Sequence, residues 1–371
     1  MNSNPTIGIL GGGQLGRMLA LAGYPLGLRF RFFDPDPAAP SGHLAEHVPA
    51  PYADAEALQA FAASVDLLTY EFENVPVEAA RKIEAIRPIY PPPAALEAAQ
   101  DRLTEKSFLQ NLGVTTPEFA AINSTADCAA AAECCGLPAV LKTRRMGYDG
   151  KGQRIVRTLA ELEAATLELG GAGLILEQFV PFSAECSILA VRSTTGETAF
   201  YPLVENVHRS GILHSSRVPA SSNIQALQAD AEVFAGRILS ALNYVGVLAI
   251  EFFVSDGRLI ANEMAPRVHN SGHWSIEGAE TSQFENHLRA VLGLPLGSVE
   301  LRGEVGMLNI IGPIPARASI LKITGAHLHL YGKSARPNRK VGHVTLIASN
   351  PEQLTSVLQQ ADDAIQSAVF D

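Results

Sequence analysis

The stretch AIEFFVSDGRLIANEMAPRVHNSGHW, residues 249–274, decides how the rest of the chain is interpreted. It contains two apolar runs, Ala249–Val254 and Arg258–Met264, which the segment Ser-Asp-Gly separates. Apolar runs joined by a short segment with Asp and Gly predict a β-hairpin. Four polar residues follow the second run, in a chain otherwise rich in alanine and leucine: Arg267, His269, Asn270 and His273. We therefore expect a hairpin that leads into a polar cluster.

Each strand of this hairpin carries one carboxylate, Glu251 or Glu263. A plain two-residue turn would place Glu251 opposite Asn262 and turn Glu263 to the other face of the sheet. A three-residue loop with Gly257 in the left-handed position of a bulge would place both carboxylates on one face. Such a pair repels unless a divalent cation such as magnesium bridges it. The alternative is a surface hairpin with two solvated glutamates, and the hairpin alone does not decide between them.

Composition indicates a folded protein of two or three domains. The chain has 371 residues, of which 47% are hydrophobic and 18% charged, so a sizeable core is available. Its net charge of −10 argues against nucleic acid as a partner. The four cysteines match neither a zinc spacing nor a disulfide framework, which fits a reducing cytoplasm. We expect no secretory signal and no membrane span.

A glycine-rich turn, residues 11–16, lies between an apolar strand at Thr6–Leu10 and a helix. Its sequence GGGQLG matches the dinucleotide fingerprint G-x-G-x-x-G, and Asp34, at the end of the next strand, lies about where a ribose-binding acid would be. This pattern predicts a nicotinamide site. Two weaker interpretations stay open: a helix N-terminus that offers N–H groups to some phosphate, or simply a tight turn.

The run Val65–Glu71 predicts another buried strand, with Glu73 and Asn74 after its carboxyl end. Ligands of open α/β sheets bind at that edge, so we expect these two residues to share a pocket with the glycine turn, although a solvated loop is an equal alternative. Three prolines, residues 91–93, then mark a boundary. A helix is expected over residues 94–112, carrying Asp101, Arg102 and Lys106.

A glycine-rich loop, TRRMGYDGKGQ at residues 143–153, joins the expected strands 139–142 and 154–157. Its glycines allow close approach to a ligand, and Lys142 and Lys151 supply positive charge. We expect a phosphate-covering loop, although the Walker A order is absent and a flexible hairpin tip is the alternative. Pro181 breaks the following strand, 174–180, which leaves backbone groups free for an adenine edge.

The last third of the chain predicts a core helix at residues 224–242, short strands from about residue 303, and a closing helix at 351–366. His208 lies in a polar segment and, taken alone, is expected to be structural. A basic loop precedes the last strand and contains Lys333, Arg336, Arg339 and Lys340. Such a loop is either solvated or bound to a phosphorylated substrate.

Together these segments resemble the ATP-grasp enzymes, and in particular the N5-carboxyaminoimidazole ribonucleotide synthetases. The segments that carry the resemblance are GILGGGQLGRM, TYEFENV, DRLTEK, GYDGKGQ, NEMAPRVHNSGHW, SQFE and RKVGH. The resemblance implies an α/β protein, α+β in its ATP-grasp part. A Rossmann-like pre-ATP-grasp domain would cover 1–112, an ATP-grasp region 113–300 with its lid at about 115–185, and a small β-rich C-terminal domain 301–371, packed on the ATP-grasp core.

The resemblance also assigns roles to residues. It implies ATP contacts at Arg102, Lys142, Gly147, Tyr148, Asp149, Gly150, Lys151, Gly152, Gln153, Glu177, Gln178, Phe179, Val180, Glu185, His208, Asn262 and Glu263. It implies ribonucleotide contacts at Gln14, Leu15, Glu73, Asn74, Asn270, Ser271, His273, Lys333, Arg339 and Lys340. The implied metal ligands are Glu251 and Glu263, and the implied catalytic residues are Tyr148, Asp149, Arg267 and His273.

The reaction implied by the resemblance is an ATP-dependent carboxylation in purine synthesis. ATP would phosphorylate bicarbonate to carboxyphosphate, which would carboxylate aminoimidazole ribonucleotide, with Mg²⁺ or Mn²⁺ as the metal and a cytoplasmic homodimer as the assembly. Three alternatives remain: another ATP-grasp carboxylase or ligase, a NAD-dependent oxidoreductase, and a non-catalytic nucleotide-binding regulator. RVHNSGHW and RKVGH argue against the first, GYDGKGQ against the second, and the intact set of charged residues against the third.

Overall fold

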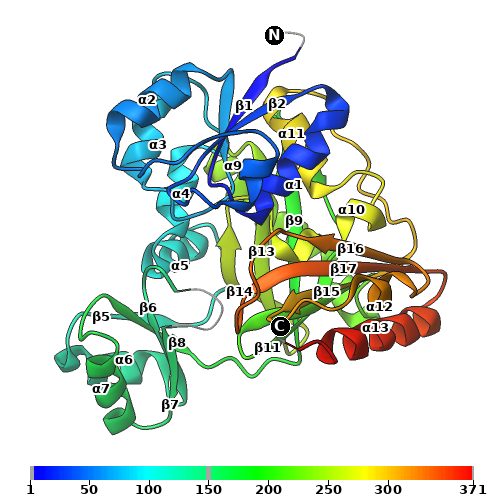
Figure 1. Ribbon diagram of the computed structural model, residues 1–371. Helices are drawn as coiled ribbons and strands as arrows, with labels where there is room; N and C mark the ends of the chain where they lie inside the picture. Colours follow the sequence, from blue (N-terminus) through cyan, green and yellow to red (C-terminus); the bar gives the residue numbers. More distant parts are fainter. Residues whose placement is uncertain (1–3, 148–151, 370–371) are drawn as a thin grey trace.

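Three β-sheets and the helices around them make up the computed structural model, which describes residues 4–147 and 152–369 (Figure 1). The first sheet is parallel and lies at the top of Figure 1, in the blue part of the chain. The second is antiparallel and stands out from the body at the lower left. The third and largest crosses the middle of the molecule.

The parallel sheet has the strand order β3-β2-β1-β4. Its strands are β1 (Thr6–Leu10), β2 (Arg29–Phe33), β3 (Glu46–Val48) and β4 (Leu67–Tyr70), and its helices are α1 (Gln14–Gly23), α2 (Ala55–Ala63) and α3 (Val77–Glu84). Because β1 pairs in parallel with β4, Leu10 lies beside Tyr70. The glycine turn and the segment that begins at Glu71 therefore leave the sheet at the same edge.

The helix expected over residues 94–112 is interrupted, and two helices are present, α4 (Pro93–Ala99) and α5 (Arg102–Asn111). Asp101 lies between them in an extended conformation, and its Oδ1 accepts hydrogen bonds from the backbone N–H groups of Leu103 and Thr104. An aspartate that caps a helix in this way competes with continuation of the preceding helix. Arg102 is consequently the first residue of α5.

The second sheet has the order β5-β8-β6-β7, with β5 (Phe119–Ile122), β6 (Ala139–Thr143), β7 (Gln153–Val156) and β8 (Leu174–Gln178). Two helices, α6 (Cys128–Cys135) and α7 (Leu159–Glu168), belong to the same unit (Figure 1). A small apolar core, including Leu141, Leu162 and Leu176, holds sheet and helices together.

The large sheet has the order β14-β13-β9-β11-β12-β15-β17-β16, with β10 paired to β9. Its strands are β9 (Ala184–Arg192), β10 (Thr198–Phe200), β11 (Val204–Arg209), β12 (Ile212–Val218), β13 (Gly246–Ser255), β14 (Arg258–Ala265), β15 (Glu304–Ile311), β16 (Ala326–Leu330) and β17 (Lys340–Ala348). The strands expected near the C-terminus thus continue the sheet that contains the hairpin, because β15 pairs with β12.

Helices lie against the large sheet: α8 (Ser222–Gln225), α9 (Gln228–Ala241), α10 (Ser275–Gly278), α11 (Gln283–Leu292), α12 (Arg317–Leu321) and α13 (Pro351–Gln366). The core helix expected over residues 224–242 is therefore two helices, although Ala231 and Ile238 of its apolar stripe are fully buried as expected. No helix among the described residues is both long and apolar enough to cross a bilayer.

One apolar core joins the parallel sheet to the large sheet. Ile9 and Phe30 of the first sheet share it with Trp274, Phe284 and Leu288, from the segment that follows the hairpin. All five side chains are almost completely buried. This shared core fixes the edge of the parallel sheet relative to the hairpin, so both can contribute to one site.

Candidate active site

The hairpin places Glu251 directly opposite Glu263, so the two carboxylates share a face. The expected cause was wrong. Asp256 and Gly257 form a two-residue turn with positive φ at both positions, and Ser255 pairs with Arg258. The register shifts farther along, between Glu251 and Phe252, where Asn262 is the extra residue of a bulge. A bulge reverses the alternation of side chains just as a longer loop would.

The oxygen atoms at this position suit a hard divalent cation. Burial and, second, the charge of Glu263 together raise the pKa of Glu251 to about 7. The side-chain oxygen of Asn262, beside Glu263 in sequence, is buried and accepts no hydrogen bond. Two carboxylates and an unsatisfied amide oxygen fit magnesium, which binds oxygen ligands. The described residues contain no group of three or more His, Cys, Asp or Glu arranged for a metal.

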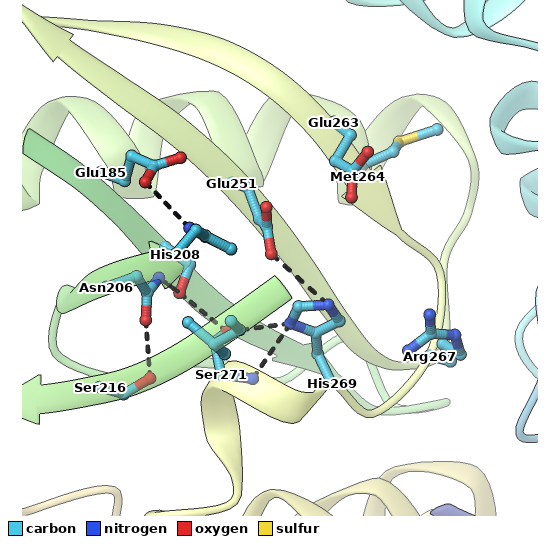
Figure 2. Close-up of polar contacts among 12 residues, drawn as sticks. Glu185, Asn206, His208, Ser216, Glu251, Glu263, Met264, Arg267, His269 and Ser271 are labelled. Carbon is cyan, nitrogen blue, oxygen red and sulfur yellow. Dashed lines mark hydrogen bonds and ion pairs between the residues drawn. The ribbon is translucent and has the colours of Figure 1, made fainter. Parts of the chain in front are cut away.

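Glu263 and Glu251 have different partners. Arg102 Nη1 lies 3.1 Å from Glu263 Oε2. Burial opposes ionisation of Glu263, but Arg102 and Lys142 outweigh it and lower the pKa of this carboxyl. Glu251 faces His269, whose Nε2 lies 3.6 Å from Oε1 (Figure 2). Burial and the charge of Arg267 lower the pKa of His269 well below its usual value, so the imidazole is neutral.

A chain of hydrogen bonds holds His269 in place, as Figure 2 shows. Ser216 donates to Asn206, Asn206 donates to Ser187, and Ser187 donates to the hydroxyl of Ser271, each over 2.8–2.9 Å. The backbone N–H of Ser271 donates to Nδ1 of His269. Nδ1 is therefore an acceptor, and the proton of the neutral ring lies on Nε2, toward Glu251.

His208 and Glu185 lie on the other side of Glu251 in Figure 2. His208 Nδ1 is 3.0 Å from Glu185 Oε2. Burial alone would lower the pKa of His208, but the hydrogen bond with Glu185 and the charge of Glu251 raise it. The sequence segment that suggested a structural histidine thus contributes a side chain to the carboxylate cluster.

Two lysines converge on Glu177, which lies in β8. Lys142 Nζ is 2.8 Å and Lys106 Nζ 3.5 Å from Glu177 Oε2. Burial opposes ionisation of Glu177, but the two lysines outweigh it and lower its pKa to about 2. Lys106 also donates to the backbone carbonyl of Asn262, 2.5 Å away, which ties this triad to the hairpin.

A cavity of about 520 Å³ collects most of these groups. The residues expected for ATP or metal that line it are Arg102, Lys142, Gly147, Gln153, Glu185, His208, Glu251, Asn262 and Glu263. The residues expected for substrate or catalysis that line it are Gln14, Leu15, Glu73, Asn74, Arg267, Asn270 and Lys340. One hollow therefore joins the edge of the parallel sheet to the hairpin and to the second sheet.

Several expected residues lie elsewhere. Gly152, Glu177, Gln178, Phe179, Val180, Ser271, His273, Lys333 and Arg339 are outside the cavity lining. His273 is fully buried and packs against Phe284 and His343, at ring-centroid distances of 5.6 and 4.8 Å, so the geometry does not support direct contact with substrate. The Glu177 side chain bonds lysines, which leaves only its backbone for an adenine edge. Tyr148, Asp149, Gly150 and Lys151 fall outside the described residues.

The cavity also contains side chains to which no role was assigned, notably Glu105, Arg144, Phe253 and His269. Arg144 donates to both oxygens of Asp101, the cap of α5. Glu105 Oε1 accepts from the backbone N–H of Met264 at 2.6 Å, next to Glu263. Only His269 had a signal in the sequence, because it belongs to the polar cluster after the hairpin.

The substrate side of the cavity has its own polar contacts. Arg267 forms an ion pair with Glu73, and Lys333 donates to the side-chain oxygen of Gln14. Both polar atoms of the Asn270 amide are buried without a hydrogen-bond partner, although this side chain lines the cavity. A buried amide that is left unsatisfied is costly unless a ligand completes it.

The glycine turn is occupied from within the protein, so the nicotinamide interpretation is wrong. The carboxylate of Glu71 accepts the backbone N–H groups of Gly13, Leu15 and Gly16 at 2.7–3.0 Å. Asp34 accepts from the backbone N–H of Gly12 and so is not available as a ribose ligand. The groups that hold a pyrophosphate in a dinucleotide fold are already bonded here.

Known proteins resemble this chain over almost its full length. Sequence models match for a ribonucleotide synthetase preATP-grasp domain at residues 4–100, an ATP-grasp domain at 107–284, and a phosphoribosylaminoimidazole carboxylase C-terminal domain at 306–357. The N5-carboxyaminoimidazole ribonucleotide synthase of Pseudomonas aeruginosa is 54% identical, covering 97% of this chain and 99% of its own. That of Brucella melitensis is 48% identical, covering 92% and 96%.

Solved structures agree. The N5-carboxyaminoimidazole ribonucleotide synthetase of Thermus thermophilus superimposes with a TM-score of 0.94 at 58% identity, over 98% of this chain and 100% of its own. The Aspergillus clavatus synthase in complex with ADP and 5-aminoimidazole ribonucleotide gives 0.91 at 31% identity, over 99% and 100%. The chain therefore belongs to the N5-carboxyaminoimidazole ribonucleotide synthase family, with an ATP-grasp domain at its centre.

Proposed function

We propose that this protein carboxylates 5-aminoimidazole ribonucleotide, using ATP and bicarbonate, in de novo purine synthesis. The products are N5-carboxyaminoimidazole ribonucleotide, ADP and phosphate. The observation that carries the proposal is a single cavity lined both by Glu251, Glu263 and Lys142 and by Gln14 and Glu73 from the parallel-sheet side. Relatives named N5-carboxyaminoimidazole ribonucleotide synthase match nearly the whole chain and support the same substrate.

In the first step an oxygen of bicarbonate attacks the γ-phosphorus of ATP, and ADP leaves. Arg102 and Lys142 line the cavity and supply positive charge against the phosphate oxygens, where charge develops during transfer. Glu185 is the proposed ribose contact, and the backbone of residues 177–180 the proposed adenine contact. The proposed role of the loop at residues 147–153, with Tyr148 and Asp149, is to close over the phosphates and exclude water.

Glu251 and Glu263 hold the proposed divalent cation, Mg²⁺ with Mn²⁺ as a substitute, and Asn262 adds its amide oxygen. When bound, the cation neutralises phosphate oxygens. The chain's own contribution is to keep both carboxylates on one face and ready to accept it. Arg102 orients Glu263, and Nε2 of the neutral His269 ring lies 3.6 Å from Glu251.

In the second step the exocyclic amine of the ribonucleotide attacks the carboxyl carbon of carboxyphosphate, and phosphate leaves. Arg267 is the proposed partner of the anionic intermediate, and the unsatisfied amide of Asn270 completes its hydrogen bonds on that intermediate or on the acceptor. Gln14, Leu15, Glu73 and Asn74 contact the ribonucleotide, and Lys333, Arg339 and Lys340 bind its phosphate.

The assembly and location are also proposals. We propose a homodimer and a cytoplasmic location by resemblance to the family, and four cysteines without disulfides suit a reducing compartment. We keep the division 1–112, 113–300 and 301–371 as a proposal, supported by three separate domain matches near these limits. The pairing of β12 with β15 means that the last two parts share one sheet.

ADP release tests the proposal. The full chain is incubated with ATP, Mg²⁺ and bicarbonate, with and without 5-aminoimidazole ribonucleotide. A sharp rise on addition of the ribonucleotide supports the proposal, and detection of the N-carboxylated product completes it. Release that needs bicarbonate and ignores the ribonucleotide would instead indicate another ATP-grasp carboxylase, and absence of release would refute the proposal.

A further inference from the structure

The carboxylate of Glu71 fills the N-terminal end of α1. Its side chain is 8% exposed, and all three of its hydrogen-bond donors are backbone N–H groups. Oε1 accepts from Gly13, and Oε2 accepts from both Leu15 and Gly16. The first N–H groups of a helix have no partner within the helix, so this carboxylate completes them and complements the helix dipole.

Two of the glycines in this turn are needed to admit Glu71. A Cβ atom on Gly13 would lie 2.4 Å from Glu71 Oε1, and one on Gly11 would lie 2.6 Å from Glu71 Cγ. Gly11 also has a φ of +100°, which other residues rarely adopt. The glycine pattern that suggests dinucleotide binding therefore serves an internal carboxylate, which takes the place a ligand phosphate would have.

The turn that Glu71 holds carries two residues of the cavity wall. Glu71 binds the backbone N–H of Leu15 and those of Gly13 and Gly16, with Gln14 between Gly13 and Leu15, and both Gln14 and Leu15 line the cavity. Gln14 accepts a hydrogen bond from Lys333, and the charge of Lys333 also acts on Glu71. Glu71 itself does not line the cavity. Any effect it has on a ligand must pass through the turn.

We propose that Glu71 is a positioning residue for the ribonucleotide. By binding three N–H groups it fixes Gln14 and Leu15 at the cavity wall, and by filling the helix N-terminus it denies that place to phosphate groups. The ribonucleotide phosphate is thereby left to the basic loop. This inference rests on the proposed function, because it takes the ligand beside Gln14 to be the ribonucleotide.

Glu71→Gln tests the inference. The amide keeps shape and size but turns one acceptor into a donor, which then faces the N–H of Gly13 or those of Leu15 and Gly16. We expect KM for the ribonucleotide to rise about tenfold or more, as befits loss of a hydrogen bond to a charged group. KM for ATP should stay within about twofold, because no ATP contact proposed above depends on this turn.

Asp66→Asn is the matched control. Asp66 accepts the backbone N–H of Thr6 at 2.7 Å, at the opposite end of β1 from the turn. Asp66→Asn removes the charge of a carboxylate that accepts a backbone N–H of the same strand, and it should change neither KM. If Glu71→Gln lowers activity and melting temperature while leaving both KM values unchanged, Glu71 is merely structural and the inference is overturned.

A double-mutant cycle asks whether Glu71 acts through Gln14. Once Gln14→Ala has removed the side chain, adding Glu71→Gln should raise KM for the ribonucleotide much less than it does alone. Fully additive effects would overturn the inference. Glu71→Asp, which keeps the charge but is one methylene shorter, replaces Glu71→Gln if the latter does not fold. A wild-type enzyme that ignores the ribonucleotide would refute the proposed function itself, and with it this inference.

Discussion

Replacing Glu177 by Gln should destabilise the protein strongly, although the side chain lies outside the cavity lining. Glu177 is 2% exposed and Lys106 is fully buried, and Lys142 completes the triad. Glutamine keeps the shape of the side chain but removes its charge, so two ammonium groups lose their only carboxylate within this triad. Breaking a buried ion pair by removing one partner leaves an uncompensated buried charge.

The pKa of Glu177 sets the magnitude. Burial opposes its ionisation, but Lys106 and Lys142 lower the pKa from 4.5 to about 2. A shift of that size corresponds to roughly 3 kcal/mol of folding free energy at neutral pH. Removal of one partner of a buried ion pair costs about 3–5 kcal/mol in general, which agrees with the value from the pKa shift. We expect a melting temperature lower by on the order of 10 °C.

Glu168→Gln provides the control within the same sheet-and-helix unit. Glu168 and its partner Arg154 are both about half exposed, at 56% and 51%, so their ion pair should contribute less than about 1 kcal/mol. Thermal and urea unfolding of the wild type and both variants give the comparison. If Glu177→Gln is no more destabilising than Glu168→Gln, the argument from buried charge fails.

The pH dependence of the Glu177 effect has a definite sign. Its pKa is lower in the folded state than in the unfolded state, so its contribution is complete above about pH 4.5 and is lost as the pH falls through about 2. The difference in stability between wild type and Glu177→Gln should therefore be constant near neutrality and shrink below about pH 4.5. A difference that grew on acidification would contradict the assignment.

Three further predictions concern the cavity. Glu251→Gln should stop ADP release yet raise the melting temperature in metal-free buffer by a few degrees. The reason is that it removes a carboxylate whose pKa burial and Glu263 raise to about 7, and a lower melting temperature would contradict this. Glu263→Gln should likewise stop ADP release and weaken Mn²⁺ binding measured by electron paramagnetic resonance, while full activity would exclude it as a ligand. Lys340→Met should raise KM for the ribonucleotide about tenfold and leave KM for ATP unchanged. Arg336→Met, in the loop before β17 and outside the cavity lining, should change neither KM.

The sequence predicted correctly that Glu251 and Glu263 share a face, but it did not predict the structural feature that brings them together. The shared face of Glu251 and Glu263 was expected from a three-residue loop, but the register shift comes from the bulge at Asn262. Counting residues from a turn cannot locate a bulge inside a strand, since only the pairing partner defines it. The break between α4 and α5 had a local signal, because Asp101 precedes the helical segment as an N-cap residue does.

The contacts that the sequence did not reveal are long-range. Glu71 lies more than fifty positions from the N–H groups it binds, and the strand before it drew attention only to Glu73 and Asn74. Glu177 was assigned to ATP through the family resemblance, whereas its side chain forms ion pairs with Lys106 and Lys142. Local patterns identify strands and their ends, but the partner of a buried charge depends on how separate sheets meet.

Four glutamates near the cavity, Glu71, Glu177, Glu251 and Glu263, differ in the partners that the fold supplies to their carboxylates. Glu71 has three backbone N–H donors and Glu177 has two lysines, so each of these carboxylates has partners within the fold. Glu251 and Glu263 face each other, and Arg102 pairs with Glu263. Glu251 has the neutral imidazole of His269 at 3.6 Å and the charges of His208 and Lys340 nearby, yet its pKa is raised to about 7. The repulsion of Glu263 on Glu251 is therefore only partly compensated in the folded chain, and a bound cation would relieve it. Relief of this repulsion therefore favours binding of the metal and, through the metal, of the phosphates.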